Sequence, residues 1–314
     1  MDYFLSVIIP CFNSGKVFLD YYLQELVYLN DVEFVIVDDC STDNSFTLLK
    51  EHIKKDNFQI IKNDKNGGPG YSRNVGIDAS RGKYVTFLDS DDFFTNSFFD
   101  RIREETNDNP DLLLFDHIVE SNNRRLFDSV FLKKPRVIEI EDLIIFTRGC
   151  PWGKVYKNDI VKKQGIRFLN QMRNEDTPFT KTAISFCKRC KYIPEPMYVY
   201  RKNPTSITHD NSNVNVENAF NAFNYVSNNI NEEYEYCLDA IFAKELFYSV
   251  SLTQIRKMEK HEWVDFVDGI VEQRPLFYKS KVYSKLPFRY KIFCHLIRKK
   301  KYRCTKTLLR LLRR

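Results

Sequence analysis

Short apolar runs alternate with amphipathic stretches along the first 118 residues of the chain. Five runs of four or five residues are largely apolar and show no regular alternation with polar positions. Such runs are typical of strands that are buried on both faces of a parallel sheet. They lie at 5–9, 34–37, 58–61, 84–88 and 112–115.

Helix-length segments lie between these runs. Residues 17–29 carry apolar positions at helical spacing, 44–53 follow a Ser-Thr-Asp start that can cap a helix, and 69–79 follow two glycines. Strands that alternate with helices at this spacing indicate βαβ units. We therefore predict an α/β fold with a Rossmann-like, doubly wound sheet.

The pattern changes after about residue 120, where strands are expected to be fewer and shorter. We predict a helix at 176–186, a strand at 197–200, a linker at 211–213 and helices from 214 to 271. The segment from Tyr278 onward is expected to form basic amphipathic helices that break near Pro287. The predicted organisation is a catalytic domain at 1–213, a helical region at 214–274 and a basic tail at 275–314.

Charge separates the tail from the rest of the chain. Residues 275–314 hold 14 Lys and Arg and no acidic residue, whereas the remainder holds 34 basic and 42 acidic residues. Two interpretations stay open: the tail binds anionic lipid at the inner face of the cell membrane, which we favour, or it packs on the body with a solvated basic face. No recognition motif for nucleic acid accompanies the charge, so we expect no nucleic-acid partner.

The cysteines and the longest apolar runs indicate the compartment. Eight cysteines are scattered, and the Cys187-x-x-Cys190 pair has no second pair at zinc-site spacing, so reduced thiols are expected. No apolar run reaches about 18 residues, and the first strand-length run stops at Pro10. We therefore expect neither a signal peptide nor a membrane span, and a cytoplasmic protein, peripheral on the inner face of the membrane.

Polar clusters follow four of the predicted strands, at 10–13, 38–41, 63–70 and 89–92. Ligands of open parallel sheets bind outside the carboxyl ends of the strands, so these clusters are expected to converge on one crevice. Asp89-Ser90-Asp91 places alternate carboxylates where a hard divalent cation can bind and still accept phosphate oxygens. A solvated acidic turn is the alternative for this motif alone, although the adjacent Asp92 makes such a turn costly without a cation.

The clusters at the second and third strands fit a nucleotide. Asp39 is expected to accept an N–H of a pyrimidine ring, while Ser41 or Asp43 would cap the next helix. Glycines at 67, 68 and 70 allow close approach of backbone N–H groups at a helix start, and Arg73 on that helix could reach a base or a phosphate. The glycine pattern is not G-x-G-x-x-G, which disfavours a dinucleotide fold.

Four of these segments together resemble the successive signatures of family 2 glycosyltransferases, which have the GT-A fold. They are SVIIPCFN at 6–13, VDDCSTD at 37–43, NGGPGYSRN at 66–74 and FLDSDD at 87–92. Their order and spacing also agree with the family. The resemblance covers about residues 4–210.

The resemblance implies a role for each matching residue. Asp91 would ligate Mn²⁺ or Mg²⁺, and this ion would offset charge on a departing nucleoside diphosphate. The nucleotide-sugar would be bound by Pro10, Phe12, Asn13, Asp39, Gly68, Arg73, Asp89, Ser90, Lys154, Arg201 and Ser206. Two departures stand out: Gly153 replaces a common Asn, and the loop at 202–205 lacks the His that some members carry.

The segment NEDTPF at 174–179 resembles the acidic motif of the family at its acceptor site. Inversion by single displacement needs a base opposite the leaving group, so Asp176 would be the catalytic base and Glu175 would orient the acceptor. A helix N-cap is the alternative for either acid. Trp152, in a segment that resembles the lining of the sugar pocket, is either part of the site or part of the core.

The sequence thus predicts an inverting glycosyltransferase that moves a sugar from a metal-bound UDP-sugar to a glycan or a lipid-linked glycan. The pathway expected from the family is synthesis of bacterial capsule, O-antigen or lipooligosaccharide. One alternative is a haloacid-dehalogenase-like phosphatase, although Phe93 stands where that class has Thr or Val. The other is a non-catalytic, membrane-associated binding protein.

Overall fold

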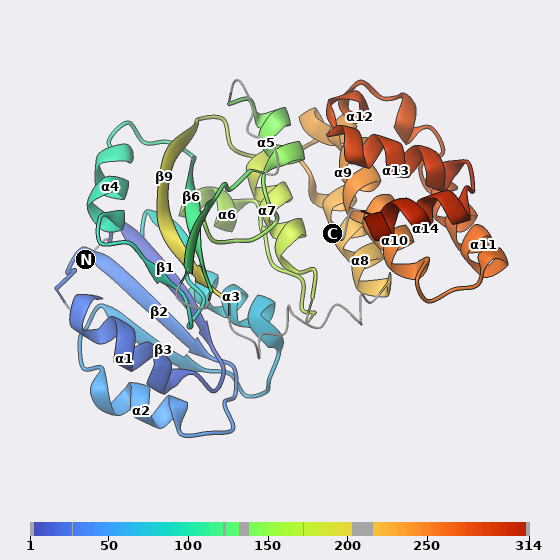
Figure 1. Cartoon of the computed structure of the whole chain (residues 1–314). Coiled ribbons are helices and arrows are strands. Elements are labelled where there is room, and N and C mark those ends of the chain that lie inside the picture. Colours follow the sequence, from blue (N-terminus) through green and yellow to red (C-terminus); the bar gives the residue numbers. More distant parts are fainter. Residues whose placement is uncertain are drawn as a thin grey trace. The chain divides into compact units, whose positions relative to one another are not determined.

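The computed structural model describes residues 3–26, 28–121, 124–131, 138–171, 173–202 and 216–311. The chain folds into two compact units, Met1–His209 and Asp210–Arg314 (Figure 1). The predicted linker at 211–213 and the predicted boundary between residues 213 and 214 lie outside the described residues, and the predicted boundary between 274 and 275 falls within the second unit.

The first unit is built around one mixed sheet. Its strands are β1 (Leu5–Cys11), β2 (Val32–Asp38), β3 (Phe58–Lys62), β4 (Tyr84–Phe87), β5 (Phe93–Phe94), β6 (Leu112–Ser121), β7 (Arg124–Asp128), β8 (Lys154–Lys157) and β9 (Cys190–Arg201). The order is β3-β2-β1-β4-β8-β6-β9-β5, with β7 paired to β6. Strands β1 to β4 run parallel, and β8 enters antiparallel between β4 and β6. The predicted α/β class is confirmed.

The central strand β1 is buried on both faces because helices cover each side of the sheet. Val7 and Ile9 belong to a core cluster with Phe18 of α1 and Leu49 of α2. Ile8 points the other way, toward α3, where a Cβ on Gly76 would lie 2.3 Å from its Cγ2. The apolar run without alternation therefore reflects a strand between two helical layers.

Strand β1 continues through Pro10, where the sequence pattern predicted its end. Ile8 accepts a bond from Leu88 on the β4 side, and Cys11 accepts one from Asp39 on the β2 side. By alternation Pro10 faces the β4 side, and β4 ends at Phe87, which is opposite Ile8. The missing N–H of Pro10 therefore breaks no ladder bond.

Seven helices of the described residues accompany the sheet. They are α1 (Gly15–Leu26), α2 (Ser45–His52), α3 (Gly68–Ala79), α4 (Phe98–Glu105), α5 (Ile140–Phe146), α6 (Asn158–Lys163) and α7 (Asp176–Ser185). The helices predicted at 17–29, 44–53, 69–79 and 176–186 correspond to α1, α2, α3 and α7, with ends that differ by at most three residues.

The expectation of fewer and shorter strands after residue 120 is wrong for β9, which has 12 residues. Its sequence contains Pro194 and Pro196, which break the pattern of a strand. The structure accommodates them in a register shift: Phe115 pairs with Ile193, but Asp116 pairs with Pro196. Residues 194–195 form the irregularity, a site at which proline is tolerated in a sheet.

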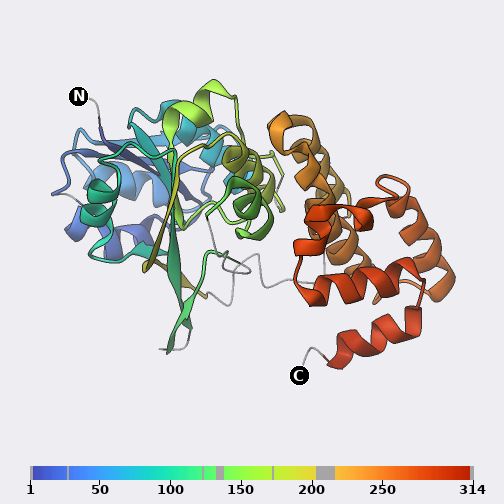
Figure 2. The ribbon, with the colours of Figure 1, turned by 90° about the horizontal axis from the view of Figure 1, so that it is seen from above.

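The second unit is helical in its described part. Its elements are α8 (Val216–Asn229), η3 (Glu232–Cys237), α9 (Leu238–Ile241), η4 (Phe242–Tyr248), α10 (Ser249–Gln254), α11 (Lys260–Val271), η5 (Phe277–Lys279), α12 (Lys281–Lys285), α13 (Phe288–Arg298) and α14 (Tyr302–Leu311). Figure 2 shows these helices from above. None of the described helices is both long and apolar enough to span a membrane.

The basic tail is part of this helical unit. Helix α13 begins after Pro287, where the sequence predicted a break, and a second break separates α13 from α14. Phe293 and Cys294 are buried, and the rings of Tyr290 and Phe293 contact Tyr248 in the π-helical turn η4. The apolar face of α13 thus packs within the unit, as in the second of the two interpretations, and the basic residues Lys299 to Lys301 lie mostly exposed.

Candidate active site

Hydrogen bonds join the polar clusters that follow β1, β2 and β4. The side-chain oxygen of Asn13, a residue with φ of 52°, accepts a bond from the backbone N–H of Thr42 at 2.9 Å. The hydroxyls of Ser14 and Ser90 lie 2.7 Å apart. The strand ends therefore lie together, as the parallel order of the strands predicted. We call the loops 10–14, 38–41, 63–70 and 89–92 the strand-end half of the site.

Asp39 holds the glycine loop in place. Its Oδ1 accepts bonds from Asn63 at 2.8 Å and from the N–H of Gly67 at 3.0 Å, and its Oδ2 accepts from the N–H of Gly68 at 2.7 Å. Gly68 has φ of +83°, a conformation that favours glycine. Asp39 is 4% exposed and accepts three hydrogen bonds from the protein, and its contact with a pyrimidine remains a prediction.

The neighbouring Asp38 was not assigned a role from the sequence. Its Oδ2 accepts from the N–H of Ser41 at 3.0 Å, but its buried Oδ1 has no hydrogen-bond partner among the described residues. Phe12, which was assigned to the nucleotide, is 46% exposed beside these loops, and Pro10 is half-buried. The strand-end half thus combines an exposed aromatic ring with an unused acceptor.

The acidic residues of the turn 89–92 make different contacts. Asp92 is buried and accepts bonds from the Tyr198 hydroxyl at 2.6 Å and the Arg201 N–H at 2.8 Å, which attaches the acidic turn to β9. Asp89 pairs with Arg73. Asp91 is half-buried, and burial raises the pKa of its carboxyl, with the charge of Asp89 adding to the rise. No side chain in the described ranges donates a hydrogen bond to Asp91.

A divalent cation fits at Asp91. Three carboxylates in four residues repel one another, and a backbone hydrogen bond and the charge of Arg201 only partly offset the rise in the pKa of Asp91. Within the described residues, no group of three or more His, Cys, Asp or Glu side chains forms a complete metal cage. Mg²⁺ is commonly held by one or two carboxylates together with phosphate and water, so a cation at Asp91 stays a prediction.

The second half of the site comprises the loop 149–152 and the start of α7; we call it the α7 half. Thr180 on α7 donates to the carbonyl of Gly149 at 2.7 Å, which fixes the loop on the helix. Trp152 stacks on Tyr198 with ring centroids 4.8 Å apart and on Tyr200 at 5.7 Å. The half-buried indole therefore belongs to an aromatic stack on β9, a neighbourhood that the sequence did not reveal.

Lys154, which was assigned to the donor, is fully buried. Its ammonium donates to the carbonyls of Cys150 at 2.7 Å and Trp152 at 3.2 Å, and burial lowers the pKa of this ammonium. The side chain thus holds the loop 149–152, and its contact with a donor remains a prediction. Arg201 lies at the end of β9, 3.6 Å from Glu120, while Ser206 lies outside the described residues.

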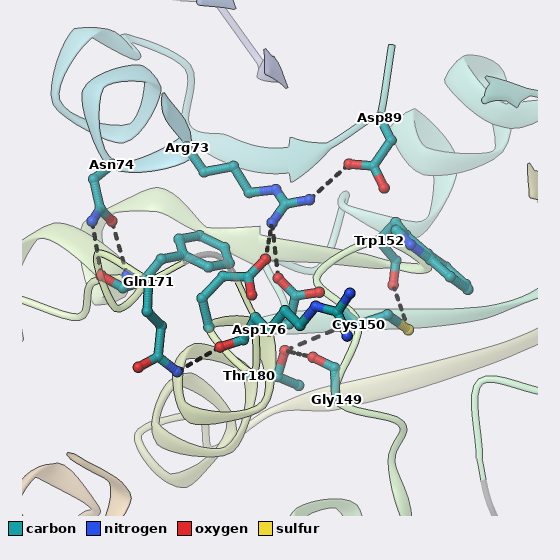
Figure 3. Close-up of polar contacts among 12 residues, drawn as sticks. Arg73, Asn74, Asp89, Gly149, Cys150, Trp152, Gln171, Asp176 and Thr180 are labelled. Atoms are coloured by element: carbon teal, nitrogen blue, oxygen red, sulfur yellow. Dashed lines mark hydrogen bonds and ion pairs between the residues drawn. The ribbon is translucent and has the colours of Figure 1, made fainter. Parts of the chain in front are cut away.

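Arg73 connects the two halves. Its Nη2 lies 2.7 Å from Asp89 Oδ1, and its Nη1 lies 2.8 Å from Asp176 Oδ1 and 3.4 Å from Glu175 Oε1. Figure 3 shows the guanidinium between Asp89 and Asp176. Asp89 follows β4 and lies 16 positions from Arg73 in the sequence, and Asp176 begins α7 and lies 103 positions away. Arg73 thus joins two distant segments of the chain.

The electrostatics at Asp176 suit a proton acceptor. Burial and then the charge of Glu175 raise the pKa of the Asp176 carboxyl, and the guanidinium of Arg73 opposes part of the rise. The Asp176 side chain nevertheless keeps 31% of its surface exposed, whereas that of Glu175 keeps 9%. Asp176 is therefore both more basic than an ordinary aspartate and accessible to a bound molecule.

Comparisons with known proteins identify the family. The model of the family "Glycosyl transferase family 2" matches residues 6–163. The chain is 28% identical over 216 residues to the uncharacterized glycosyltransferase EpsJ of Bacillus subtilis, covering 65% of this chain and 62% of that protein. It is 26% identical over 301 residues to the poly(ribitol-phosphate) β-N-acetylglucosaminyltransferase TarS of Staphylococcus aureus, covering 90% and 51%. The chain thus spans between half and two thirds of the length of these relatives.

Solved structures show the same fold. The crystal structure of S. aureus TarS 1–349 in complex with UDP-GlcNAc matches 98% of this chain and 91% of that one, with a TM-score of 0.75 and 22% identity. The mannosyltransferase PcManGT from Pyrobaculum calidifontis, in complex with GDP-Man and Mn²⁺, matches 97% of this chain and 87% of that one, with a TM-score of 0.57 and 12% identity. At these identities the likeness concerns the fold, and it extends over the helical unit as well as the sheet.

Proposed function

The chain belongs to glycosyl transferase family 2, and from this premise we propose that it transfers a sugar from a UDP-sugar to an acceptor hydroxyl with inversion at the anomeric carbon. One observation carries the proposal: Asp176, an accessible carboxylate with a raised pKa, is tied through Arg73 to Asp89 at the acidic strand end. A base and a diphosphate-binding turn are thereby held in one site. Membership of this family argues against the phosphatase alternative, and the accessible acid at Asp176 argues against the non-catalytic one.

The proposed reaction is a single displacement. The acceptor hydroxyl transfers its proton to the Asp176 carboxylate while its oxygen forms a bond to the anomeric carbon. The bond from that carbon to the diphosphate breaks, and UDP departs with the electron pair. Proton transfer of this kind contributes on the order of 10²–10⁴-fold to a rate.

The strand-end half is proposed to bind the nucleotide. Phe12 offers an exposed ring to the base, and Asp39 fixes the glycine loop by accepting from the N–H groups of Gly67 and Gly68. Asp91 would hold Mn²⁺ or Mg²⁺, which supplies charge stabilisation for the departing diphosphate. Ser90, held by Ser14, and Asn13, held by Thr42, would fix the loops around the donor.

The acceptor is proposed to be a glycan or lipid-linked glycan of a bacterial surface polymer, such as a capsule or an O-antigen. TarS and a relative from Bacillus spizizenii, a poly(ribitol-phosphate) β-glucosyltransferase that is 26% identical over 288 residues, are named for another surface polymer. Poly(ribitol phosphate) therefore belongs among the acceptors to be tested. The accepting hydroxyl and the linkage formed depend on the shape of the pocket, and small changes in that shape alter specificity.

A location at the inner face of the cell membrane is the last part of the proposal. Residues 275–314 contain 14 basic residues and no acidic residue, and Lys299 to Lys301 are mostly exposed, with Lys300 paired to Asp268 at 2.7 Å. Each basic residue near an anionic surface contributes about 1 kcal/mol. We expect the chain to co-sediment with vesicles that contain phosphatidylglycerol and to lose most of this binding when Lys299, Lys300 and Lys301 are changed to Gln. Equal binding to neutral vesicles would contradict this location.

The donor site is tested by thermal unfolding in the presence of nucleotide-sugars with and without Mn²⁺. A ligand at 100 times its Kd stabilises the folded state by about 2.7 kcal/mol. We expect a rise in Tm with UDP-sugars plus Mn²⁺, a much smaller rise with either alone, and none with phosphomonoesters. Stabilisation by no nucleotide-sugar, together with no transfer to any acceptor, would contradict the proposed function.

A further inference from the structure

We propose that Arg73 is a positioning residue that orients the carboxylate of Asp176, in place of the nucleotide contact that the family resemblance implies for it. The inference rests on the proposed function, in which Asp176 is the base. The buried guanidinium of Arg73 links Asp89, on the donor side of the site, to Asp176.

Both terminal nitrogens of Arg73 are already engaged by the protein. Nη2 binds Asp89 at 2.7 Å and Nη1 binds Asp176 at 2.8 Å, with Glu175 at 3.4 Å (Figure 3). The side chain is only 4% exposed. Nη2 keeps a second N–H, and Nε has no hydrogen-bond partner among the described residues, but burial of the side chain leaves a phosphate or base little access to these groups.

The guanidinium of Arg73 also packs against the ring of Phe168. Asn74, the next residue of α3, donates to the carbonyl of Phe168 at 2.8 Å and accepts from the N–H of Phe168 at 2.8 Å. This pair clamps the Phe168 backbone on α3, and the Phe168 ring lies 5.3 Å from the centre of the Arg73 guanidinium. Arg73 is therefore held by a rigid helix and an aromatic face as well as by acids.

The arrangement gives Asp176 one fixed oxygen and an accessible surface. Oδ1 is bound to Arg73, while 31% of the side chain remains exposed for an acceptor hydroxyl. A base held by a third group keeps its orientation during the reaction, as in other base–orienter pairs. Arginine suits this position because its planar fork binds Asp89 and Asp176 with different nitrogens, whereas lysine offers a single ammonium.

The test separates positioning from donor binding. We expect Arg73→Gln to lower kcat about 10²-fold, the loss that follows from a small misplacement of a catalytic group, with the Kd for UDP changed less than threefold. Arg73→Lys, which keeps the charge without the fork, is expected to lose less. Arg103→Gln, which removes a surface pair with Asp31, is the control for loss of an arginine ion pair.

A double-mutant comparison completes the test. If Arg73 acts through Asp176, then adding Arg73→Gln to Asp176→Asn lowers the residual rate no further, because the two residues act as a unit. A tenfold or greater rise in the Kd for UDP with kcat preserved, or losses that multiply in the double mutant, would overturn the inference. Should Arg73→Gln not fold cooperatively, Arg73→Lys alone and in combination with Asp176→Asn gives the same comparison. A wild-type chain that transfers no sugar would instead contradict the proposed function.

Discussion

The two halves of the site are held together by different kinds of interaction. In the strand-end half, short polar side chains fix neighbouring loops through backbone N–H groups: Asn13 binds Thr42, and Asp39 binds Gly67 and Gly68. In the α7 half, Asp176 is fixed by the buried guanidinium of Arg73. In the first half, carboxylates such as Asp39 and Asp92 accept hydrogen bonds from uncharged donors, whereas in the second half the Asp176 carboxylate is held by a cation.

This difference indicates that donor binding and proton transfer depend on different parts of the site. Loops that are held through backbone groups can present a binding surface without any residue that reacts. A carboxylate whose pKa is raised by burial and by Glu175, and which is held by Arg73, is suited to accept a proton. Changes in the strand-end half should therefore act on donor affinity and stability, and changes in the α7 half should act on kcat.

The largest expected effect comes from Asp176→Asn. The amide keeps the size of the side chain but cannot accept the proton, so we expect kcat to fall on the order of 10²–10⁴-fold with the Kd for UDP unchanged. Steady-state rates and calorimetric titration of UDP measure the two quantities. Asp159→Asn, at an exposed acid on α6, is the control. An unchanged kcat, or loss of UDP binding, would contradict the separation of catalysis from donor binding.

Asp39→Asn is expected to act on the other half. The amide cannot accept all three bonds that Asp39 makes, so one or more buried N–H groups lose their partner, which costs about 1–3 kcal/mol of unfolding free energy. We also expect the affinity for UDP to fall about tenfold, equivalent to about 1.4 kcal/mol, with kcat at saturating donor largely kept. Urea unfolding and UDP titration measure these quantities. A stable variant with normal affinity for UDP and a low kcat would contradict the role of Asp39 in donor binding.

Gly70→Ala tests where the halves touch. A Cβ at Gly70 would lie 2.5 Å from the carbonyl oxygen of Leu169 and 3.0 Å from Cγ of Glu175, so backbone must shift. Overpacking of this kind costs about 1–3 kcal/mol, and displacement of Glu175 should lower kcat. In the control Gly269→Ala, the new Cβ meets nothing within 4 Å in helix α11, and a gain of about 0.5–1 kcal/mol is expected. Equal stability of the two variants would refute this contact.

The smallest expected effect is a shift in the pH profile. Asp176 must be ionised to act, and its pKa is raised, so kcat/KM should fall with decreasing pH at a higher pH than for an ordinary aspartate. Glu175→Gln removes a charge that raises this pKa, so the acidic limb should move to lower pH, whatever the change in the maximal rate. A limb that stays in place or moves upward would show that another group controls it.

The sequence predicted the strand-end half better than the α7 half. Its residues lie in short segments directly after apolar strands, and parallel strands bring such segments together. Order along the chain therefore sufficed to place Asn13, Asp39, Asp89 and Ser90 near one another. Ser14 and Asn63, which hold these loops through Ser90 and Asp39, could have been suspected only from their position beside the motifs.

The rest depends on contacts between distant segments. The pairing of Arg73 with Asp176 joins residues 103 positions apart, and Asp92 with Tyr198 joins residues 106 positions apart. Neither has a local pattern. Strand β8 and most of β9 were missed because short or proline-containing strands lack clear periodicity, and the packing of α13 on η4 was hidden because an amphipathic basic helix has the same pattern on a protein core as on a membrane.

The stereochemistry of transfer tests the central claim most directly. The account holds that Asp176 takes the proton of the acceptor hydroxyl while that oxygen attacks the face of the sugar opposite the departing UDP. With a donor whose sugar is α-linked to the diphosphate, proton NMR of the first-formed product should show a β linkage. An α-linked product would contradict the single displacement and with it the role of Asp176.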